Sequence, residues 1–370
     1  MSPVSPRPAG PRRAPRAAAL LLAGTAAAWL AKRAVRRRIQ DAPLWPLPAL
    51  ETPVSGYSPR RPLRALITSC DRPAEDVLVV TVESPELPAW EPGAHVDLVL
   101  PSGRVRQYSL CGDPADTGRW RIAIRRVDGG RGGSIEAHEQ LVEGAELELR
   151  PPRNRFPLEP AARYEFVAGG IGITPLLPML RAAQAAGTPW RLRYGGRSLA
   201  TMPFRDELAA YGDRVTLCPQ DETGLPDLTD LADLPPGTLV HACGPEPMLT
   251  AVAEALGPEG ARDRLRLERF APASPGAGAA AGTDRPFTVE LRRTGRVVEV
   301  PAGTSTLAAI RAELPGVPYS CEQGFCGTCQ HRVLAGAVDH RDDLLTDGER
   351  ADSMLLCVSR ARGEHLVIDL

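Results

Sequence analysis

The sequence predicts a multidomain chain with an antiparallel β-barrel, an α/β domain with a parallel sheet, and a small C-terminal β-grasp domain. Three observations lead to this fold class. Short alternating strands come first, strands that alternate with helices follow, and a hairpin, a helix and a cysteine-rich loop come last. The expected parts are 1–62 (tail and linker), 63–157 (barrel), 158–270 (α/β domain), 271–285 (linker) and 286–370 (β-grasp domain).

The first forty residues are basic. They hold nine of the 44 lysines and arginines and no acidic residue, which leaves 35 basic against 45 acidic side chains in the remainder. The apolar run over 17–31 is shorter than the roughly 20 residues that span a bilayer. We expect a tail that packs on nothing; contact of residues 17–38 with a membrane surface and a secretory signal are the alternatives. The body has no basic patch for nucleic acid, and we expect a cytoplasmic monomer.

Residues 63–157 have the pattern of an all-β domain. The expected strands cover 77–82, 95–100, 104–110, 120–125 and 147–150. Within the third of them, alternation places Arg106 and Tyr108 on one face and Ser109 on the other. Ser109 would therefore act chiefly through its backbone.

Two features of this domain indicate a phosphate site. Arg106, Tyr108 and Ser109 offer a guanidinium, an aromatic ring and a hydroxyl, and 128–134 is a glycine-rich turn. We expect Ser134 to be the N-cap of a short helix, because a glycine-rich turn that opens a helix presents free N–H groups to a phosphate. Each feature is common alone. Together, in one small β domain upstream of the cysteines described below, they predict a flavin-phosphate site.

Residues 158–270 alternate strands and helices. Gly169-Gly170-Ile171-Gly172-Ile173-Thr174-Pro175 follows a buried strand over 164–168. Thr174 suits the N-cap of the next helix and Pro175 its first position. Glycines between a strand and a helix let a dinucleotide approach the backbone, although this is not the usual G-x-G-x-x-G pattern.

A second turn of this domain lies at the end of a later strand, over 238–242. Cys243-Gly244-Pro245 occupies this turn, where α/β sheets bind ligands. A small buried hydrophobe is the alternative interpretation of Cys243. Arg197, after the strand over 190–194, would contact an adenosine 2′-phosphate or lie in solvent, so the residues alone do not separate NADH from NADPH. The last strand is expected over 264–270.

The cysteines of the last unit form a spaced set. Cys321, Cys326 and Cys329 stand at C-x4-C-x2-C spacing, and Cys357 follows after 27 intervening residues. Plant-type [2Fe–2S] ferredoxins have this spacing. Zinc sites favour two short-spaced pairs, and a zinc site or a disulfide pair is the alternative. The other four cysteines are scattered singly, which fits a reducing compartment. A hairpin over 287–300 and a helix over 304–313 precede the loop, in the order of a β-grasp ferredoxin.

The three units together resemble the phthalate dioxygenase reductase and vanillate demethylase reductase family over roughly 63–370. Besides the motifs above, Glu268-Arg269-Phe270, His340-Arg341-Asp342 and Cys357-Val358-Ser359-Arg360-Ala361 match the family. The resemblance implies FMN rather than FAD, NADH as the donor, and a terminal oxygenase, Rieske-type or cytochrome P450, as the partner. That partner would dock near Glu322, Gln323 and Phe325, which we expect to be exposed.

The resemblance also implies roles for individual residues. Thr174 and Cys243 would flank the nicotinamide as the catalytic residues, and Phe270 would lie near the flavin ring. Arg125 stands where the family has a lysine. The expected cofactor-binding residues are Arg106, Tyr108, Ser109, Arg125, Gly132, Ser134, Gly170, Gly172, Thr174, Arg197, Gly244 and Phe270. The expected metal ligands are Cys321, Cys326, Cys329 and Cys357.

These parts predict an electron-transfer enzyme. A hydride from NADH carries two electrons and the cluster accepts one, so a flavin is needed between them. The cluster would pass each electron to a separate oxygenase. A redox-sensing iron–sulfur flavoprotein and a free-standing flavin reductase are the alternatives. A sensor needs neither a nicotinamide site nor a flavin site, and the intact cysteine set argues against a reductase that works without its ferredoxin.

Overall fold

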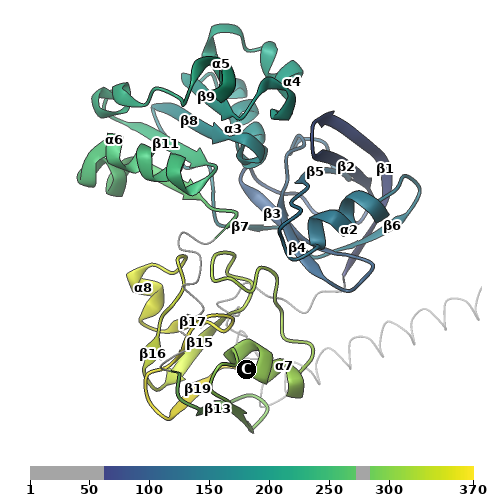
Figure 1. The fold of residues 1–370 in the computed structure, drawn as a ribbon, viewed down its shortest axis with the longest axis vertical. Coiled ribbons are helices and arrows are strands. Elements are labelled where there is room, and N and C mark those ends of the chain that lie inside the picture. Colours follow the sequence, from purple (N-terminus) through teal and green to yellow (C-terminus); the bar gives the residue numbers. More distant parts are fainter. Residues whose placement is uncertain (1–61, 272–283) are drawn as a thin grey trace, which may run out of the picture. The chain divides into compact units, whose positions relative to one another are not determined.

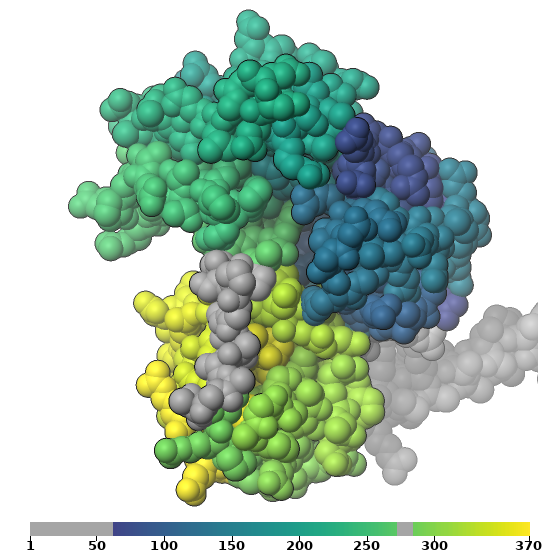
Figure 2. All heavy atoms as spheres, in the orientation of Figure 1, coloured from purple at the N-terminus to yellow at the C-terminus, as the bar shows by residue number. Residues whose placement is uncertain are grey.

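The structure, a computed structural model, describes residues 62–271 and 284–370. The basic tail with residues 17–38, and most of the expected linker over 271–285, lie outside the described residues. In the part that is described, no helix is long and apolar enough to cross a membrane. In Figure 2 the atoms of residues 62–157 (purple to blue), 158–271 (teal to green) and 284–370 (green to yellow) form three separate groups.

The first domain is an antiparallel barrel with one helix (Figure 1). Its elements are β1 (Leu63–Ala74), β2 (Val77–Glu83), β3 (Ala94–Val99), β4 (Val105–Ser109), β5 (Arg119–Arg125), α2 (Gly133–Gln140), β6 (Glu146–Leu149) and β7 (Arg153–Asn154). The strands pair in the order β4-β3-β6-β1-β2-β5, and β7 pairs with β3. A bridge between Leu110 and Ile122 joins the two ends of this order. Alternate residues point inward, so Ile67, Val80 and Ile124 are fully buried in one core.

The second domain is a parallel sheet with helices on both faces (Figure 1). Its main elements are β8 (Arg163–Gly169), α3 (Ile173–Ala185), β9 (Trp190–Gly196), α4 (Arg205–Ala209), β10 (Val215–Pro219), α5 (Gln220–Thr223), β11 (Thr238–Cys243), α6 (Glu246–Arg264) and β12 (Leu265–Glu268). The strand order is β10-β9-β8-β11-β12. Phe166 belongs to the core that α3 covers, and its neighbour Val167 belongs to the core that α6 covers. Both faces of β8 are therefore buried, which explains its continuous apolar run.

The third domain has a mixed five-stranded sheet. Its elements are β13 (Phe287–Leu291), β14 (Arg296–Val300), α7 (Thr306–Glu313), β15 (Gln330–Ala335), β16 (Val338–Asp339), α8 (Asp347–Arg350), β17 (Ser353–Leu355), β18 (Arg360–Ala361) and β19 (His365–Ile368). The order is β14-β13-β19-β15-β17, with β13 and β19 parallel. Leu307 and Ile310 of α7 are buried in the core of this domain. The three folds confirm the predicted fold class.

Two helices begin earlier than the sequence indicated. The N-cap of α2 is Gly132, whose φ of 75° only glycine adopts readily, and the Ser134 hydroxyl instead accepts a hydrogen bond from the Val127 N–H at 3.0 Å. The N-cap of α3 is Gly172, and the Thr174 hydroxyl donates to the Ile171 carbonyl oxygen at 3.0 Å. Both N-cap predictions were wrong, because each hydroxyl bonds to backbone upstream of the helix.

Candidate functional site

Arg106 of β4 lies against the start of α2. A Cβ atom on Gly133 would stand 2.3 Å from Arg106 Nε, so the guanidinium fits there only because Gly133 has no side chain. One guanidinium nitrogen donates to the Arg131 carbonyl oxygen at 3.2 Å. Burial, together with the positive charge of Arg131, lowers the pKa of Arg106. Positive charge beside a helix start is the environment that a phosphate needs, so these residues fit the phosphate of a flavin.

Two other predicted flavin residues, Ser134 and Arg125, form no hydrogen bond or ion pair with Arg106 within the described ranges. The Ser134 hydroxyl is taken up by Val127, and Arg125 is exposed at the end of β5. Within residues 62–271 and 284–370, no hydrogen bond or ion pair links Arg125 to Arg106 or to Ser134. The ring of Tyr108 packs partly on the barrel core, and burial raises its pKa to about 12.

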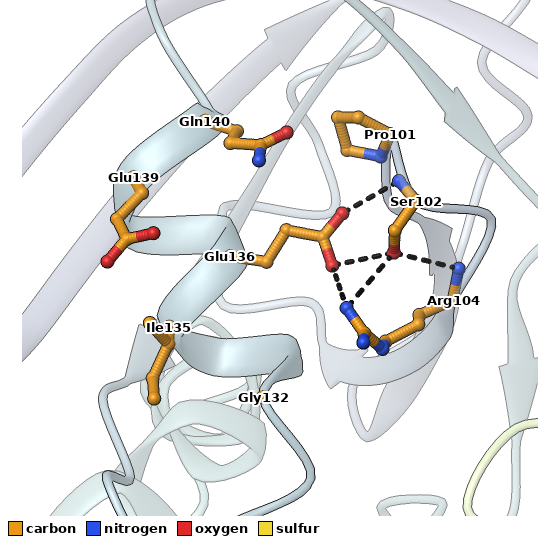
Figure 3. A pocket seen from close by; sticks show the side chains of 8 residues that line it. All are labelled: Pro101, Ser102, Arg104, Gly132, Ile135, Glu136, Glu139 and Gln140. Atoms are coloured by element: carbon orange, nitrogen blue, oxygen red, sulfur yellow. Dashed lines mark hydrogen bonds and ion pairs between the residues drawn. The ribbon is translucent and has the colours of Figure 1, made fainter.

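A cavity of about 490 Å³ opens beside Gly132, next to α2 and the turn between β3 and β4 (Figure 3). It is lined by Pro101, Ser102, Arg104, Gly132, Ile135, Glu136, Glu139 and Gln140. Glu136 accepts two hydrogen bonds from Ser102, each of 2.7 Å, and one from Arg104 at 2.9 Å. Burial alone would raise the pKa of Glu136, but these hydrogen bonds outweigh burial and lower the pKa. The Glu136 carboxylate is already paired, so it offers a ligand no unmet hydrogen bond.

A different face of the barrel carries buried polar groups without partners. Ser109 on β4 and His95 on β3 are register partners, so their side chains share a face. Both His95 ring nitrogens are buried and have no hydrogen-bond partner among the described residues, and the enclosed Ser109 hydroxyl and Glu268 Oε2 face each other without a well-formed hydrogen bond. Burial lowers the pKa of His95 well below its ordinary value, so the ring is neutral. Buried polar groups in native proteins are normally paired. A flavin ring, with carbonyls and nitrogens along its edge, fits as the missing partner.

The turns that follow β8 and β11 pack backbone against backbone. Ala168 and Cys243 are register partners at the ends of these strands. A Cβ on Gly172 would stand 2.2 Å from the Cys243 carbonyl oxygen, and a Cβ on Gly244 would stand 3.0 Å from the Gly169 Cα. Glycine is therefore required at both positions. The predicted nicotinamide residues Gly172, Cys243 and Gly244 thus come together at one edge of the sheet.

Thr174 and Cys243 are both buried, and burial raises the pKa of Cys243 well above its ordinary value. Cys243 is also the register partner of Glu268. Burial raises the pKa of Glu268 to about 8, against an opposing contribution from the facing Ser109. A hydroxyl of the barrel, a neutral carboxyl and a neutral thiol therefore meet here.

We predicted no role for Glu268. It alternates with Arg266 in β12, a pattern typical of a solvent-facing side chain. In the structure Glu268 is half-buried, and its Oε2 atom is enclosed near Ser109 of the barrel. Arg197 is exposed after β9, and no side-chain hydrogen bond or ion pair joins it to another predicted site residue within the described ranges. Phe270, two residues after Glu268, leaves 40 % of its surface exposed.

Replacing Glu268 with glutamine should remove a pH dependence of stability. The pKa of this carboxyl is about 8 in the folded chain, against an ordinary 4.5, so the folded state binds more protons between these values. The free energy of unfolding should therefore fall as the pH rises through this window, and stability is greatest below it. Urea unfolding at several pH values between 5 and 9 measures this, with the slope reduced in Glu268→Gln. Equal slopes in the two proteins would contradict a raised pKa of the Glu268 carboxyl.

The four cysteines of the last domain are free thiols and are 2–7 % exposed. The thiols of Cys326 and Cys357, and the Gln323 N–H at 3.4 Å, point at the sulfur of Cys321 and lower its pKa. Gly327 bends the loop with a φ of 73°. No three His, Cys, Asp or Glu side chains of the described ranges are arranged around a single ion. A two-iron cluster instead takes two thiolates at each iron, and four buried, convergent thiols fit it.

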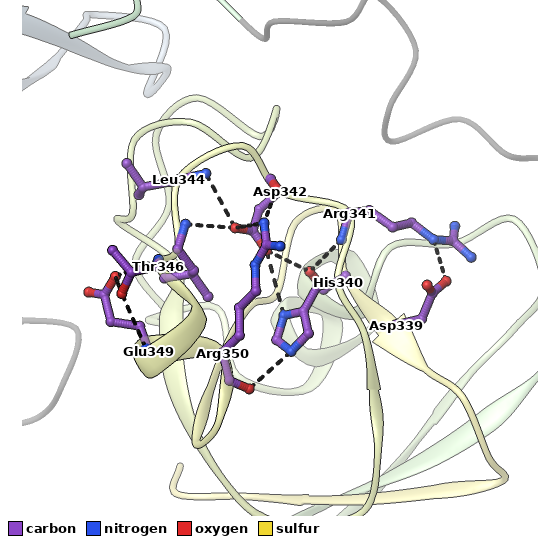
Figure 4. A network of polar contacts seen from close by, with 10 residues as sticks. Asp339, His340, Arg341, Asp342, Leu344, Thr346, Glu349 and Arg350 are labelled. Carbon is purple, nitrogen blue, oxygen red and sulfur yellow. Dashed lines mark hydrogen bonds and ion pairs between the residues drawn. The ribbon is translucent and has the colours of Figure 1, made fainter. Parts of the chain in front are cut away.

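A buried carboxylate holds the loop in place (Figure 4). Asp342 accepts hydrogen bonds from the Leu345 N–H at 2.8 Å and from the Ser359 hydroxyl at 3.5 Å. The Asp343 N–H donates to the Gly324 carbonyl oxygen at 3.3 Å. Since Ser359 lies two residues beyond Cys357, these bonds tie the distant ligand to the three-cysteine loop.

The predicted exposure of the loop is only partly found. Glu322 and Gln323 are exposed, but Phe325 is half-buried. Glu322 also forms an ion pair with Arg131 of the barrel at 3.4 Å. Its carboxylate is therefore already engaged with the residue that neighbours the phosphate site.

Known proteins of similar sequence and structure also have a [2Fe–2S] domain or belong to oxygenase systems. Residues 289–362 match the family model for a 2Fe-2S iron-sulfur cluster binding domain. The chain is 43 % identical to the phenoxybenzoate dioxygenase subunit beta of Ectopseudomonas oleovorans, over 80 % of this chain and 94 % of that one. It is 37 % identical to phthalate dioxygenase reductase of Burkholderia cepacia, over 83 % and 97 %. The solved structure of a phthalate dioxygenase reductase matches with a TM-score of 0.63 and 35 % identity, over 84 % of this chain and 98 % of that one. An intact type IV self-sufficient cytochrome P450 monooxygenase matches with a TM-score of 0.74 and 39 % identity, over 84 % of this chain and 41 % of that one.

A flavin barrel, a pyridine-nucleotide domain and a [2Fe–2S] domain on one chain define an iron–sulfur flavoprotein oxidoreductase that transfers electrons. The near-complete coverage of the curated relatives narrows this class further. The chain belongs to the phthalate dioxygenase reductase family.

Proposed function

We propose that the chain is the reductase component of a multicomponent oxygenase system. It oxidises NADH, uses FMN, and passes single electrons through a [2Fe–2S] cluster to a separate Rieske-type oxygenase, with a cytochrome P450 as the alternative partner. Relatives that the chain covers almost fully are named as subunits or reductases of dioxygenases, which supports a separate partner. The chain acts as a monomer.

The observation that carries this proposal is the meeting of Ser109, Glu268 and Cys243. A bound FMN would supply the conversion of a hydride from the nicotinamide into single electrons. Ser109 and His95 would hold the flavin ring, and Arg106 with the start of α2 would hold its phosphate. The pKa of the Cys243 thiol and that of the Glu268 carboxyl are both raised by burial, so both groups are mainly neutral at pH 7.

The nucleotide domain positions the donor. The glycine turn after β8 brings backbone N–H groups to the dinucleotide, and Thr174 and Cys243 bound the nicotinamide pocket. In the third domain, Cys321, Cys326, Cys329 and Cys357 hold the two irons. The chain's own contribution is thus position and electrostatics, without an acid or a base that exchanges a proton with substrate.

The loaded protein tests this directly. NADH should reduce both ferricyanide and cytochrome c, NADPH should do so less well, and the extracted flavin should be FMN. NADH oxidation that is absent with every artificial acceptor would contradict the reductase function and favour a redox sensor. Extracted FAD would contradict the flavin assignment.

Replacing Cys243 with alanine should slow reduction of the flavin by NADH by about 10- to 100-fold, because a small misplacement at a reacting centre costs that much. Stopped-flow bleaching of the flavin measures the rate. The matched control is Cys218→Ala, which removes a half-buried thiol on β10 of the same sheet. An unchanged rate in Cys243→Ala would show that the thiol contributes to packing and does not position the nicotinamide.

A further inference from the structure

A buried carboxylate on the barrel lies where the barrel contacts the cluster loop. Asp97 of β3 keeps only 2 % of its side chain exposed. Arg153 of β7 donates to its Oδ1 at 2.8 Å, and Arg150 stands 3.7 Å from its Oδ2. Burying a charged group is expensive unless it is paired. Asp97 on β3, Arg153 on β7 and Arg150, which directly follows β6, therefore form a fixed unit.

The other terminal guanidinium nitrogen of Arg153 contacts the cluster loop. Its Nη1 donates to the Thr328 hydroxyl oxygen at 2.9 Å, and that oxygen lies 3.3 Å from the sulfur of Cys326. Because the guanidinium has only donors, Thr328 must accept from it. The hydroxyl hydrogen is then free to point at the Cys326 sulfur.

The same unit holds the loop at its other end. Arg150 donates to the Tyr319 carbonyl oxygen at 3.2 Å, two residues before Cys321. Strand β3, which carries Asp97, pairs directly with β4, which carries Arg106 and Ser109. A chain of short contacts therefore runs from the flavin strand to a cluster ligand.

We propose that Arg153 is a positioning residue for electron transfer from flavin to cluster, acting through the Thr328 hydroxyl on the sulfur of Cys326. The inference rests on the proposed function and deepens it. One electron leaves the reduced flavin and converts one ferric ion of the cluster to ferrous; no protein bond forms or breaks, and Thr328 keeps its proton. A hydrogen bond to a ligand sulfur and a nearby cation both stabilise the more negative, reduced cluster. Arg153 therefore raises the reduction potential of the cluster and holds the loop against β3.

The test uses the full chain loaded with flavin and cluster. In Arg153→Gln and in Thr328→Val, NADH should reduce the flavin at the wild-type rate, and the following reduction of the cluster should slow by about tenfold. The equilibrium constant of that step should fall by about tenfold as well, which corresponds to a cluster potential lower by 59 mV for one electron. A redox titration followed by electron paramagnetic resonance measures the potential.

Further variants separate the relay from a structural effect. Thr328→Ser restores the hydroxyl and should restore the potential, and the double variant should be no worse than either single one. Arg119→Gln, an exposed arginine of the same barrel paired with Glu83, should change nothing. Thr328→Val leaves the pair of Asp97 and Arg153 intact, so it remains informative if Arg153→Gln does not fold.

An unchanged cluster potential in Thr328→Val, with normal transfer in the wild type, would overturn this inference alone. Additive losses in the double variant would overturn the relay through Thr328. A wild-type protein whose flavin is reduced by NADH while its cluster stays oxidised would overturn the proposed function as well.

Discussion

Replacing Cys326 with alanine should abolish electron delivery to cytochrome c while NADH still reduces the flavin. Each iron of a [2Fe–2S] cluster needs two protein thiolates, and Cys326 is one of the four buried sulfurs that converge in this loop. Removal of a hydrogen-bond partner of a metal ligand already lowers metal affinity or activity by up to about 100-fold. Removal of a ligand itself should therefore lower electron delivery by at least roughly that much. Alanine is preferred to serine, because a serine oxygen could still bind iron.

The measurement compares two electron acceptors in one preparation. Ferricyanide can take electrons from the flavin, so its reduction by NADH should persist, while cytochrome c reduction and bound iron and sulfide should be lost. Cys70→Ala, which removes a half-buried thiol on β1 far along the chain from the loop, serves as the control. If cytochrome c reduction survived in Cys326→Ala without bound iron, electrons would leave from the flavin and the cluster would not be the exit.

Local patterns carried most of the fold and the cluster site. Strand alternation indicated the barrel, continuous apolar strands indicated the parallel sheet, and cysteine spacing alone indicated a [2Fe–2S] loop, which the matched domain family confirms. These features depend on residues close together in the chain. The helix starts were missed for an equally local reason: Gly132 and Gly172 begin the helices, whereas Ser134 and Thr174 bond to backbone behind them.

The residues that the sequence did not reveal depend on contacts between distant segments. His95 and Glu268 alternate with other residues as exposed polar groups would, yet His95 is 2 % exposed and Oε2 of the half-buried Glu268 is enclosed. Arg153 lies in a two-residue strand with no periodicity to interpret, and its partner Thr328 is 175 residues away. A single sequence holds no signal for pairs of this kind, because neither residue is unusual in its own segment.

Replacing Gly172 with alanine should disable the nicotinamide site. The added Cβ would stand 2.2 Å from the carbonyl oxygen of Cys243 and 2.9 Å from the backbone nitrogen of Gly244. Both are backbone atoms, so no side-chain rotation relieves the clash, and the end of β11 must move away from the turn after β8. Overpacking of this kind costs about 1–3 kcal/mol and sometimes more, and we expect the upper end of that range. Because Cys243 moves with its backbone, flavin reduction by NADH should fall by at least about tenfold.

Urea unfolding gives the stability loss, and stopped-flow reduction by NADH gives the rate. Chemical reduction by dithionite, which needs no nicotinamide pocket, should remain normal for both flavin and cluster in the same preparation. The matched control is Gly363→Ala, where an added Cβ meets nothing within 4 Å and φ is not positive. Wild-type stability together with a wild-type rate in Gly172→Ala would show that the two turns are not in contact. A normal rate with reduced stability would show that the contact supports the fold without positioning Cys243 for the reaction.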